Sequence, residues 1–435
     1  MKKFLINHSL NQDSLNNPQN LPWQNFIANN HQFSANIENE VNNIINQVLS
    51  NQDQALINLT NKFDHTNAQN IADLIITNDQ IQQSHLTLSD TLKSAIDQAY
   101  QRIYSFHQKQ LPQDNIFEDE CKTTLGNIWK AIDHVGVYVP GGTASYPSSL
   151  LMSVIPALVS GVKKISLFVP SPNSYVNPAI LYCAKLCNIN KIYQIGGAQA
   201  IAAMAYGTQT ITKVDKIVGP GNSYVNYAKK RLYGIVGIDM IAGPTDVTII
   251  CDASANANWI AIDALSQLEH GVDSKAFIVC DDENFADEIV ANIKKNLAQL
   301  SRHEIIKKSL ENSAIFIIKN LEESSIIANL IAPEHLQICV DKPANIVKKI
   351  NNAGAIFVGN YTPEAIGDYV AGPSHTLPTS GNARFSSGLS VYDFLKRISY
   401  IACSPQSFEK IRNCAATLAQ SEGLDAHKLS IDIRQ

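Results

Sequence analysis

The chain has 435 residues, of which 45% are hydrophobic, and a formal net charge of −5 at pH 7. With domains of roughly 150 residues, this length indicates about two to four folding units with full cores. No clustered run of Lys and Arg is present, which argues against a nucleic-acid-binding protein. No apolar run approaches the roughly 20 residues of a membrane span.

The N-terminus, MKKFLINHSLNQDS, has two lysines without a sustained apolar run after them. We therefore expect no cleaved signal peptide and a cytoplasmic protein. Eight cysteines occur, and none lies in a C-x-x-C pair. Buried thiols in a reducing compartment are the favoured interpretation.

The first 80 residues are rich in Asn and Gln, a composition also found in disordered segments. Apolar residues nevertheless recur at helical spacing from Ile37 to Leu59, which predicts an amphipathic helix. A second helix is predicted at about residues 86–109, where an apolar stripe runs from Leu88 to Phe106.

From residue 135, short β-rich runs end in Gly or Pro, and each leads into a helix-like stretch. These runs lie at 135–142, 164–172, 191–200 and 216–222. Similar β-rich runs occur again at 246–252, 276–282, 314–320 and 355–360. The alternation predicts parallel sheets with crossover helices in two related α/β units. The last 45 residues are expected to be helical. In open α/β sheets the ligand lies beyond the carboxyl ends of the strands.

Gly-rich turns fall at those ends, at Pro140–Gly142, Gly196–Gly197 and Gly219–Asn222. Such turns let the backbone approach a nucleotide phosphate, but they also occur as tight βα turns without a ligand. None matches G-x-G-x-x-G, and no acidic residue stands at the usual distance for a ribose. Both interpretations stay open from these turns alone.

Four other segments carry polar groups suited to a metal site. They are SQLEHG at 266–271, APEH at 332–335, Asp368 with the loop AGPSHTLPTSG at 371–381, and EGLDAH at 422–427. Their His, Asp, Glu and Gln side chains form a plausible ligand set for zinc, manganese or cobalt if the fold brings them together. Cysteine is absent from them, which argues against a closed structural zinc site, and no H-E-x-x-H motif indicates a zincin protease.

The run from Trp259 to His270 is predicted to be helical, with a stop at Gly271. Gln267 and His270 would then share a face in the last turn, an arrangement also found in plain helix capping. Glu334 and His335 are adjacent and follow Pro333. In extended backbone they point opposite ways, which suits either an acid/base pair or a buried His beside a surface Glu.

These segments together closely resemble the histidinol dehydrogenase family, from VGVYVPGGTASYPSS to SEGLDAHKLSIDIR. The most specific parts are SQLEHG, APEHL and GDYVAGPSHTLPTSG. The resemblance implies oxidation of L-histidinol through L-histidinal to L-histidine by two NAD in turn, with one zinc ion per subunit. It also implies a homodimer in which a C-terminal segment reaches the partner's active site.

The resemblance assigns roles to residues of this chain. Glu334 and His335 match the catalytic acid/base residues, and the implied zinc ligands are Gln267, His270, Asp368 and His427. Substrate contacts are implied for Thr245, Gln267, His270, His335, Asp368, His375, Glu422 and His427, and NAD contacts for Tyr138, Gln199 and Asn222. Thr245 in AGPTDV replaces the Ser of many members and keeps the hydroxyl.

The implied fold is α/β, similar to aldehyde dehydrogenases, with two incomplete Rossmann-like parallel-sheet domains and small helical segments at both ends. Its expected parts are an N-terminal segment (1–33), a larger catalytic domain (34–137 with 245–385), an NAD-binding domain (138–244) and a C-terminal helical segment (386–435).

The chemistry favours His335 as the acceptor of hydroxyl protons and Glu334 as the base that activates water for the aldehyde step. Water is the preferred nucleophile because Cys251, Cys280 and Cys339 lie in apolar strands rather than in loops. The metal would orient substrate through its imidazole and amine. The alternatives are a metal-dependent hydrolase, a non-catalytic metal- or nucleotide-binding module, and a dehydrogenase of another amino alcohol.

Overall fold

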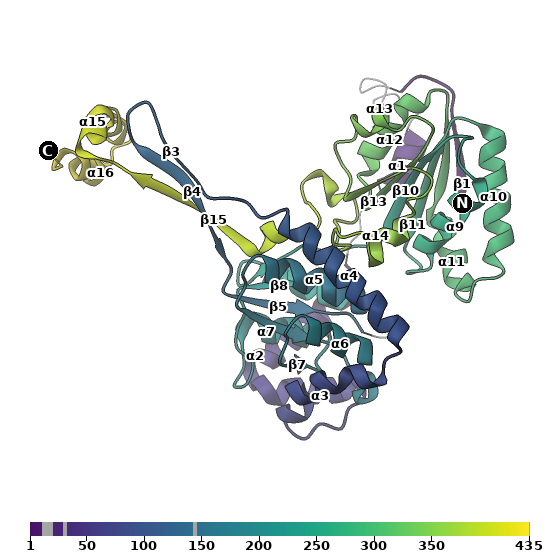
Figure 1. The fold of residues 1–435 in the computed structure, drawn as a ribbon, viewed down its shortest axis with the longest axis horizontal. Coiled ribbons are helices and arrows are strands. Elements are labelled where there is room, and N and C mark those ends of the chain that lie inside the picture. The colour runs from purple at the N-terminus through teal and green to yellow at the C-terminus, as the bar shows by residue number, and fades with distance from the viewer. Residues whose placement is uncertain (11–20, 29–32, 142–145, 435) are drawn as a thin grey trace.

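The computed structural model describes residues 1–10, 21–28, 33–141 and 146–434. It consists of two α/β units and an arm that projects away from both (Figure 1). No helix within these described ranges is long and apolar enough to cross a membrane.

The first unit is built on a six-stranded sheet with the order β2-β7-β6-β5-β8-β9. All its neighbouring strands pair in parallel except β2, which is antiparallel to β7. Taken in chain order, β5 to β9 follow the 3-2-1-4-5 arrangement of a doubly wound sheet. The strands are β2 (Ile75–Ile76), β5 (His134–Tyr138), β6 (Lys164–Phe168), β7 (Ile192–Tyr193), β8 (Lys216–Val218) and β9 (Gly237–Ile238).

Helices cover both faces of this sheet, which is why its strands are apolar on both sides. One face carries α4 (Asp90–Gln108), α5 (Pro147–Val159) and α6 (Pro178–Leu186), with α3 (Asn78–Gln83) packed on α6. The other carries α2 (Ala35–Asp64), α7 (Gly197–Tyr206) and α8 (Ser223–Leu232).

The second unit has another six-stranded sheet, entirely parallel, with the order β1-β12-β11-β10-β13-β14. Its strands are β1 (Lys2–Ile6), β10 (Asp246–Cys251), β11 (Lys275–Cys280), β12 (Ala314–Ile318), β13 (His335–Cys339) and β14 (Ala355–Val358). The helices are α1 (Leu21–Ile27), α9 (Ala257–Leu268), α10 (Glu283–Leu297), α11 (His303–Ser309), α12 (Ser324–Ile331), α13 (Ala344–Val347) and α14 (Glu364–Tyr369). Two apolar clusters, one on each face, form its core.

The arm consists of a three-stranded antiparallel sheet and two helices at its tip (Figure 1). Its elements are β3 (Asn115–Glu118), β4 (Thr124–Ala131), β15 (Leu395–Ala402), α15 (Pro405–Ser421) and α16 (Asp425–Asp432). Large apolar side chains stay exposed along it, among them Ile116, Phe117, Ile398, Ile401, Leu418 and Leu429. A lone arm cannot bury these side chains, so its surface is suited to contact with another protein surface.

The helix predicted at residues 37–59 is confirmed as part of α2, although Gln52 interrupts it with a non-helical backbone conformation. The second predicted helix corresponds to α4. The helix predicted through His270 is shorter than expected, because α9 ends at Leu268 and Glu269 forms its C-cap. His270 therefore lies in the loop that follows the helix.

Two strands differ from expectation. Residues 395–402 form strand β15, not helix, because all eight residues pair with β4. Residues 2–6, expected only as part of an N-terminal segment, form β1 at the edge of the second sheet. Both strands depend on partners far away in sequence, so local periodicity did not indicate them.

The grouping of residues 34–137 with the second unit also differs from the structure. Helices α2 and α4 pack on helices of the first unit, and strand β5 lies inside the first sheet. Strands β3 and β4 of the same range belong to the arm. We therefore propose that residues 35–108, 134–141 and 146–238 belong to the first unit and that 2–10, 21–27 and 246–369 belong to the second.

Candidate active site

A cavity of about 280 Å³ lies where the two units meet. The first unit contributes Pro140, Ser149 and Gly219, among others. Six of the residues singled out in the sequence line the same cavity, namely Thr245, His270, Glu334, His335, Asp368 and His375. These six residues, from Thr245 to His375, span 130 positions of the sequence and are thus brought into one pocket.

The two sheets present opposite edges to this cavity. The first sheet contributes the turns that follow the carboxyl ends of β5 and β8, as expected. The second sheet contributes Thr245, just before β10, and Glu334 and His335, at the start of β13. The expectation that ligands lie beyond carboxyl ends is therefore wrong for the second sheet, whose amino ends face the cavity.

Glu334 is buried, and its Oε2 is held by two donors. The Thr245 hydroxyl donates to it, and the backbone N–H of Asp246 donates over 3.2 Å. The Asp246 carboxylate in turn accepts from the backbone N–H of Glu334 at 3.2 Å. Burial raises the pKa of Glu334 well above its ordinary value, and the nearby Asp246 carboxylate adds to the rise. The two donors oppose this shift because they stabilise the ionised form.

His335 is buried with its two ring nitrogens in different surroundings. Nδ1 lies 3.3 Å from the carbonyl oxygen of Asp246, which fixes it as the N–H donor in the neutral ring. Nε2 is buried without a hydrogen-bond partner among the described residues. It lies 3.8 Å from Glu364 and 3.9 Å from Asp368. Burial lowers the pKa of His335 to about 4, so the ring is neutral at pH 7 and Nε2 carries a free lone pair.

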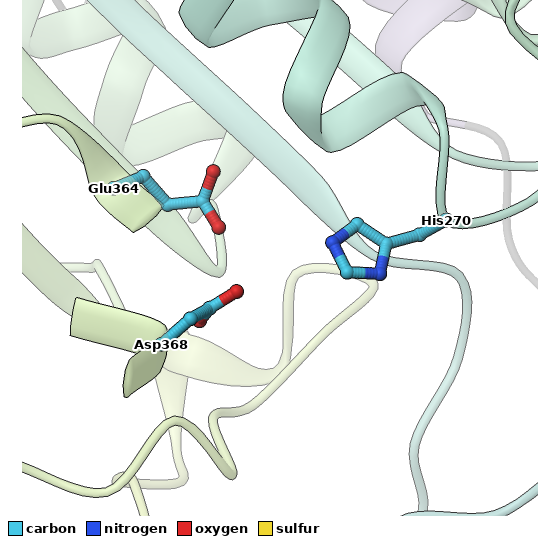
Figure 2. Close-up of side chains that lie close together, drawn as sticks. All are labelled: His270, Glu364 and Asp368. Carbon is cyan, nitrogen blue, oxygen red and sulfur yellow. The ribbon is translucent and has the colours of Figure 1, made fainter. Parts of the chain in front are cut away.

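His270, Glu364 and Asp368 each offer a ligand atom, and these three atoms lie within 4.8 Å of one another. Figure 2 shows the imidazole on one side and the two carboxylates on the other, all facing a common point. Glu364 was not singled out in the sequence. The available signal was its spacing of four residues from Asp368, which places both on one face of α14.

Gln267 is fully buried at the end of α9 and contacts the Thr245 hydroxyl. With its amide turned over, its nitrogen lies 3.0 and 3.2 Å from the two Glu364 oxygens, and its oxygen would then compete with Glu334 for the single proton of the Thr245 hydroxyl. Gln267 thus lies beside the carboxylate cluster and connects it to Thr245 and Glu334.

His375 joins the two units. Its Nδ1 lies 3.0 Å from the carbonyl oxygen of Asp368, and its Nε2 lies 3.0 Å from the hydroxyl of Ser149 on α5. With Nδ1 as the donor, Nε2 accepts from Ser149. Burial lowers the pKa of His375. Ser149 was not expected from the sequence.

Within one chain, Glu422 and His427 do not reach the cavity. Both are exposed at the tip of the arm, beside and on α16 (Figure 1). Neither is among the residues that line the cavity. A role at this site would require the arm of another chain.

Tyr138, Gln199 and Asn222, the residues expected at an NAD site, lie at the carboxyl edge of the first sheet. The Tyr138 hydroxyl accepts from the backbone N–H of Gly197 at 3.2 Å. Gln199 is buried, and its Oε1 has no partner among the described residues. Asn222 caps α8, since its Oδ1 accepts from the N–H groups of Tyr224 and Val225. Its cap role is structural and its NAD contact stays a prediction.

A buried ion pair between Lys229 and Asp239 holds the turn at Gly219. Lys229 donates to the Gly219 carbonyl at 3.0 Å, and Asp239 accepts from the Gly219 N–H at 2.7 Å. Gly219 has a φ of +115°, and a Cβ there would collide with the Tyr138 carbonyl oxygen. The pair therefore fixes a turn that only glycine can make at the cavity wall.

No cysteine is among the described residues that line the cavity. Cys251, Cys280 and Cys339 end their strands at the opposite edge of the second sheet. Burial raises the pKa of all three thiols. They are therefore not placed to act as nucleophiles in this cavity.

Comparison with known proteins gives a consistent result. Residues 27–435 match the family model "Histidinol dehydrogenase". A relative named histidinol dehydrogenase 1 from Nostoc sp. is 44% identical over 415 residues, 95% of each chain. The Nitrosomonas europaea histidinol dehydrogenase is 46% identical, covering 92% of this chain and 93% of the relative. The crystal structure of histidinol dehydrogenase from Elizabethkingia anophelis superposes with a TM-score of 0.93 at 36% identity and covers 100% of this chain and 98% of that one.

The low pKa of His335 predicts a pH-dependent loss of stability in metal-free protein. The unfolded ring binds a proton below about pH 6.5, whereas the folded ring does so only near pH 4. Stability should fall as the pH drops through this window, by about 3 kcal/mol from this residue. Urea unfolding at pH 7 and pH 4 should show this loss reduced in His335→Asn and unchanged in a variant of the exposed His303, His303→Ala. Equal losses in the wild type and His335→Asn would contradict the assignment.

Proposed function

The chain belongs to the histidinol dehydrogenase family, which catalyses the NAD-dependent oxidation of histidinol to histidine, and we propose that this protein carries out that reaction with a bound zinc ion. The observation that carries the proposal is the convergence of Glu334, His335 and the His270–Glu364–Asp368 cluster around one cavity. The cavity also borders the turns of the first sheet.

The donor set suits a divalent metal. One imidazole nitrogen and two carboxylate oxygens lie close enough to share an ion, and nitrogen with oxygen is a ligand mixture that zinc accepts. Glu364 and Asp368 repel each other, and burial together with Asp368 raises the pKa of Glu364. We propose that His270, Asp368 and Gln267 hold zinc with Glu364 beside them, and that His427 of a second chain completes the set.

The carboxyl edge of the first sheet suits NAD. A Cβ on Gly196 would lie 2.6 Å from the Pro170 ring, so glycine here lets the turns after β6 and β7 pack closely together at this edge. Gln199 has unused hydrogen-bonding capacity there. NAD supplies the acceptor for hydride from the substrate carbon, and we propose contacts from Tyr138, Gln199 and Asn222.

In the first half-reaction His335 is proposed to take the hydroxyl proton of histidinol. Its Nδ1 hydrogen bond to the Asp246 carbonyl directs the lone pair of Nε2 toward the carboxylate cluster. The ring is neutral at pH 7, as a base must be. The zinc ion would supply a binding point for the imidazole and amine of histidinol, and Thr245 and His375 are proposed to contact the substrate.

In the second half-reaction an oxygen must be added to the aldehyde before another hydride can leave. We propose that water is the nucleophile and that Glu334 takes its proton, since no thiol lines the described part of the cavity. Glu334 must be ionised for this step. The hydroxyl of Thr245 and the N–H of Asp246 favour that form, whereas burial disfavours it.

The exposed arm supports a homodimer with shared sites. Glu422 and His427 lie on a projecting element with apolar side chains left open to solvent. We propose that the arm of each chain packs on its partner and brings Glu422 and His427 to the partner's cavity. A cytoplasmic location is proposed as well, because all eight cysteines are free thiols, as a reducing compartment favours.

The metal site predicts that His270→Ala lowers zinc content and activity together. Metal content is measured by mass spectrometry, and NADH formation from histidinol is followed with and without a chelator. The His303→Ala variant should keep both properties, because His303 is exposed and is not among the residues that line the cavity. Glu364→Gln should weaken metal affinity by about 10- to 100-fold if the carboxylate supports the ligands. Full activity of metal-free His270→Ala would reject the ligand assignment.

The proposed role of Glu334 predicts unequal effects on the two half-reactions. Glu334→Gln should slow histidinal oxidation by roughly 100- to 10,000-fold and histidinol oxidation much less, because only the former needs a base for water. Single-turnover NADH absorbance measures each step separately. The surface variant Glu322→Gln serves as the control, since Glu322 pairs with Lys349 away from the cavity. Equal losses in both steps would exclude this role.

Shared sites predict complementation between two inactive variants. A heterodimer of a His427→Ala chain and a His335→Ala chain contains one intact site, so roughly half of the wild-type activity should return. A heterodimer of His335→Ala and Glu334→Gln chains should form almost no histidine, because each cavity carries a lesion in a step that histidine formation needs. Absence of activity in a purified His427→Ala/His335→Ala heterodimer would argue against exchange of arms.

A further inference from the structure

The second strand of the first sheet is not followed by the acidic residue that doubly wound sheets that bind NAD usually have there. In such sheets an Asp or Glu about 20 residues beyond the first Gly-rich turn binds the ribose 2′-hydroxyl. Here the corresponding second strand is β6, which is followed by Val169, Pro170 and Ser171. The sequence contains no Asp or Glu between residues 134 and 214. Any acid at this edge must come from another part of the chain.

Asp64, the last residue of α2, occupies that place. The backbone N–H of Ser171 is near enough to its carboxylate to lower the pKa of Asp64, against the opposing and larger effect of burial. Helix α2 packs against the short 3-10 turn η5 (Pro172–Ser174) that follows. Asp64 is also near enough to Tyr138, at the end of β5, to act on it electrostatically. The carboxylate therefore lies at the carboxyl edge of the sheet, beside the ends of its first two strands.

Polar atoms at this edge have hydrogen-bonding capacity that the described residues do not use. Asp64 Oδ2, Ser171 Oγ and Gln199 Oε1 are all buried without a partner among them. Ser171 is fully buried, and Gln199 is 1% exposed. Buried polar atoms normally find partners, because leaving them unpaired is costly. A polar ligand bound at this edge would satisfy these three atoms.

The backbone around Asp64 adopts conformations that non-glycine residues rarely take. His65 has a φ of 52°, and in the turn after β6 Asn173 and Ser174 have φ values of 55° and 60°. Left-handed backbone of this kind is unfavourable for side-chain-bearing residues and is concentrated at functional sites. These turns fix the end of α2 against the end of β6.

We propose that Asp64 determines cofactor specificity by accepting a hydrogen bond from the 2′-hydroxyl of the adenosine ribose of NAD, with the Ser171 hydroxyl beside it. The inference rests on the proposed NAD-dependent function and extends it to the choice between NAD and NADP. A 2′-phosphate would meet a carboxylate of like charge and no nearby Lys or Arg ion-paired to it among the described residues. The chain thus supplies from a helix outside the sheet the acid that its second strand lacks.

The test measures dinucleotide binding by calorimetry without histidinol. Wild-type protein should bind 2′-deoxy-NAD and NADP roughly 10- to 100-fold more weakly than NAD. Asp64→Ala should bind NAD more weakly by a similar factor and should no longer distinguish NAD from 2′-deoxy-NAD, whereas Asp64→Asn keeps an acceptor oxygen and removes only the charge. In both variants the preference for NAD over NADP should shrink, because the repelling charge is gone. Glu38→Gln removes the same charge from the other end of α2 and should match the wild type.

Thermal unfolding of each variant shows whether weaker binding comes from a lost contact or from a protein that no longer folds. Should the Asp64 variants fail to fold, the comparison of NAD with 2′-deoxy-NAD on wild-type protein decides, since it needs no variant. Equal affinity of the wild type for these two ligands would overturn the proposal, and so would an unchanged NAD preference in folded Asp64→Asn. A wild-type protein that binds none of the dinucleotides would instead contradict the proposed function as a whole, and the specificity role with it.

Discussion

Three carboxylates crowd a small space at this site with no Lys or Arg ion-paired to them among the described residues. Glu334 and Glu364 are buried, and Asp368 is partly buried. Lys229 also lines the cavity but is committed to Asp239. Burying like charges together is costly, so the cluster must either take up protons or bind a cation. The raised pKa values of Glu334 and Glu364 and the proposed zinc site have the same cause, which is the repulsion among these buried carboxylates.

The geometry that creates this crowding comes from two sheets meeting by opposite edges. The first sheet presents turns after its strands, where glycine backbone can approach a cofactor. The second presents the starts of β10 and β13, two paired strands inside the sheet, where Thr245, Glu334 and His335 lie. In the proposed function, substrate chemistry takes place beside a buried sheet, and the cofactor binds at the turns of the other sheet. The segment from Asp239 to Thr245 connects these two edges directly.

Sequence reasoning found much of this site because its residues stand in short, polar, Gly- and Pro-punctuated segments. It predicted the α/β class and six cavity-lining residues correctly as neighbours, but it missed Glu364, whose spacing from Asp368 was the available signal. Strand β15 could not be predicted locally, because its side chains face solvent and its pairing partner lies some 270 residues earlier. The position of Asp64 could not be predicted either, because nothing in the sequence of α2 indicates that its last residue lies near Ser171. Contacts between distant segments set these features.

The absence of a thiol from the described cavity wall has a consequence for the intermediate. Enzymes that oxidise aldehydes through a cysteine hold the reactive carbon by a covalent bond, whereas here such a tether would have no sulfur to form it. With water as the nucleophile, as proposed, retention of the aldehyde would be non-covalent, and the relative rates of escape and onward oxidation would determine its fate. How long the amine and imidazole stay anchored would decide how much free aldehyde reaches the surrounding solution.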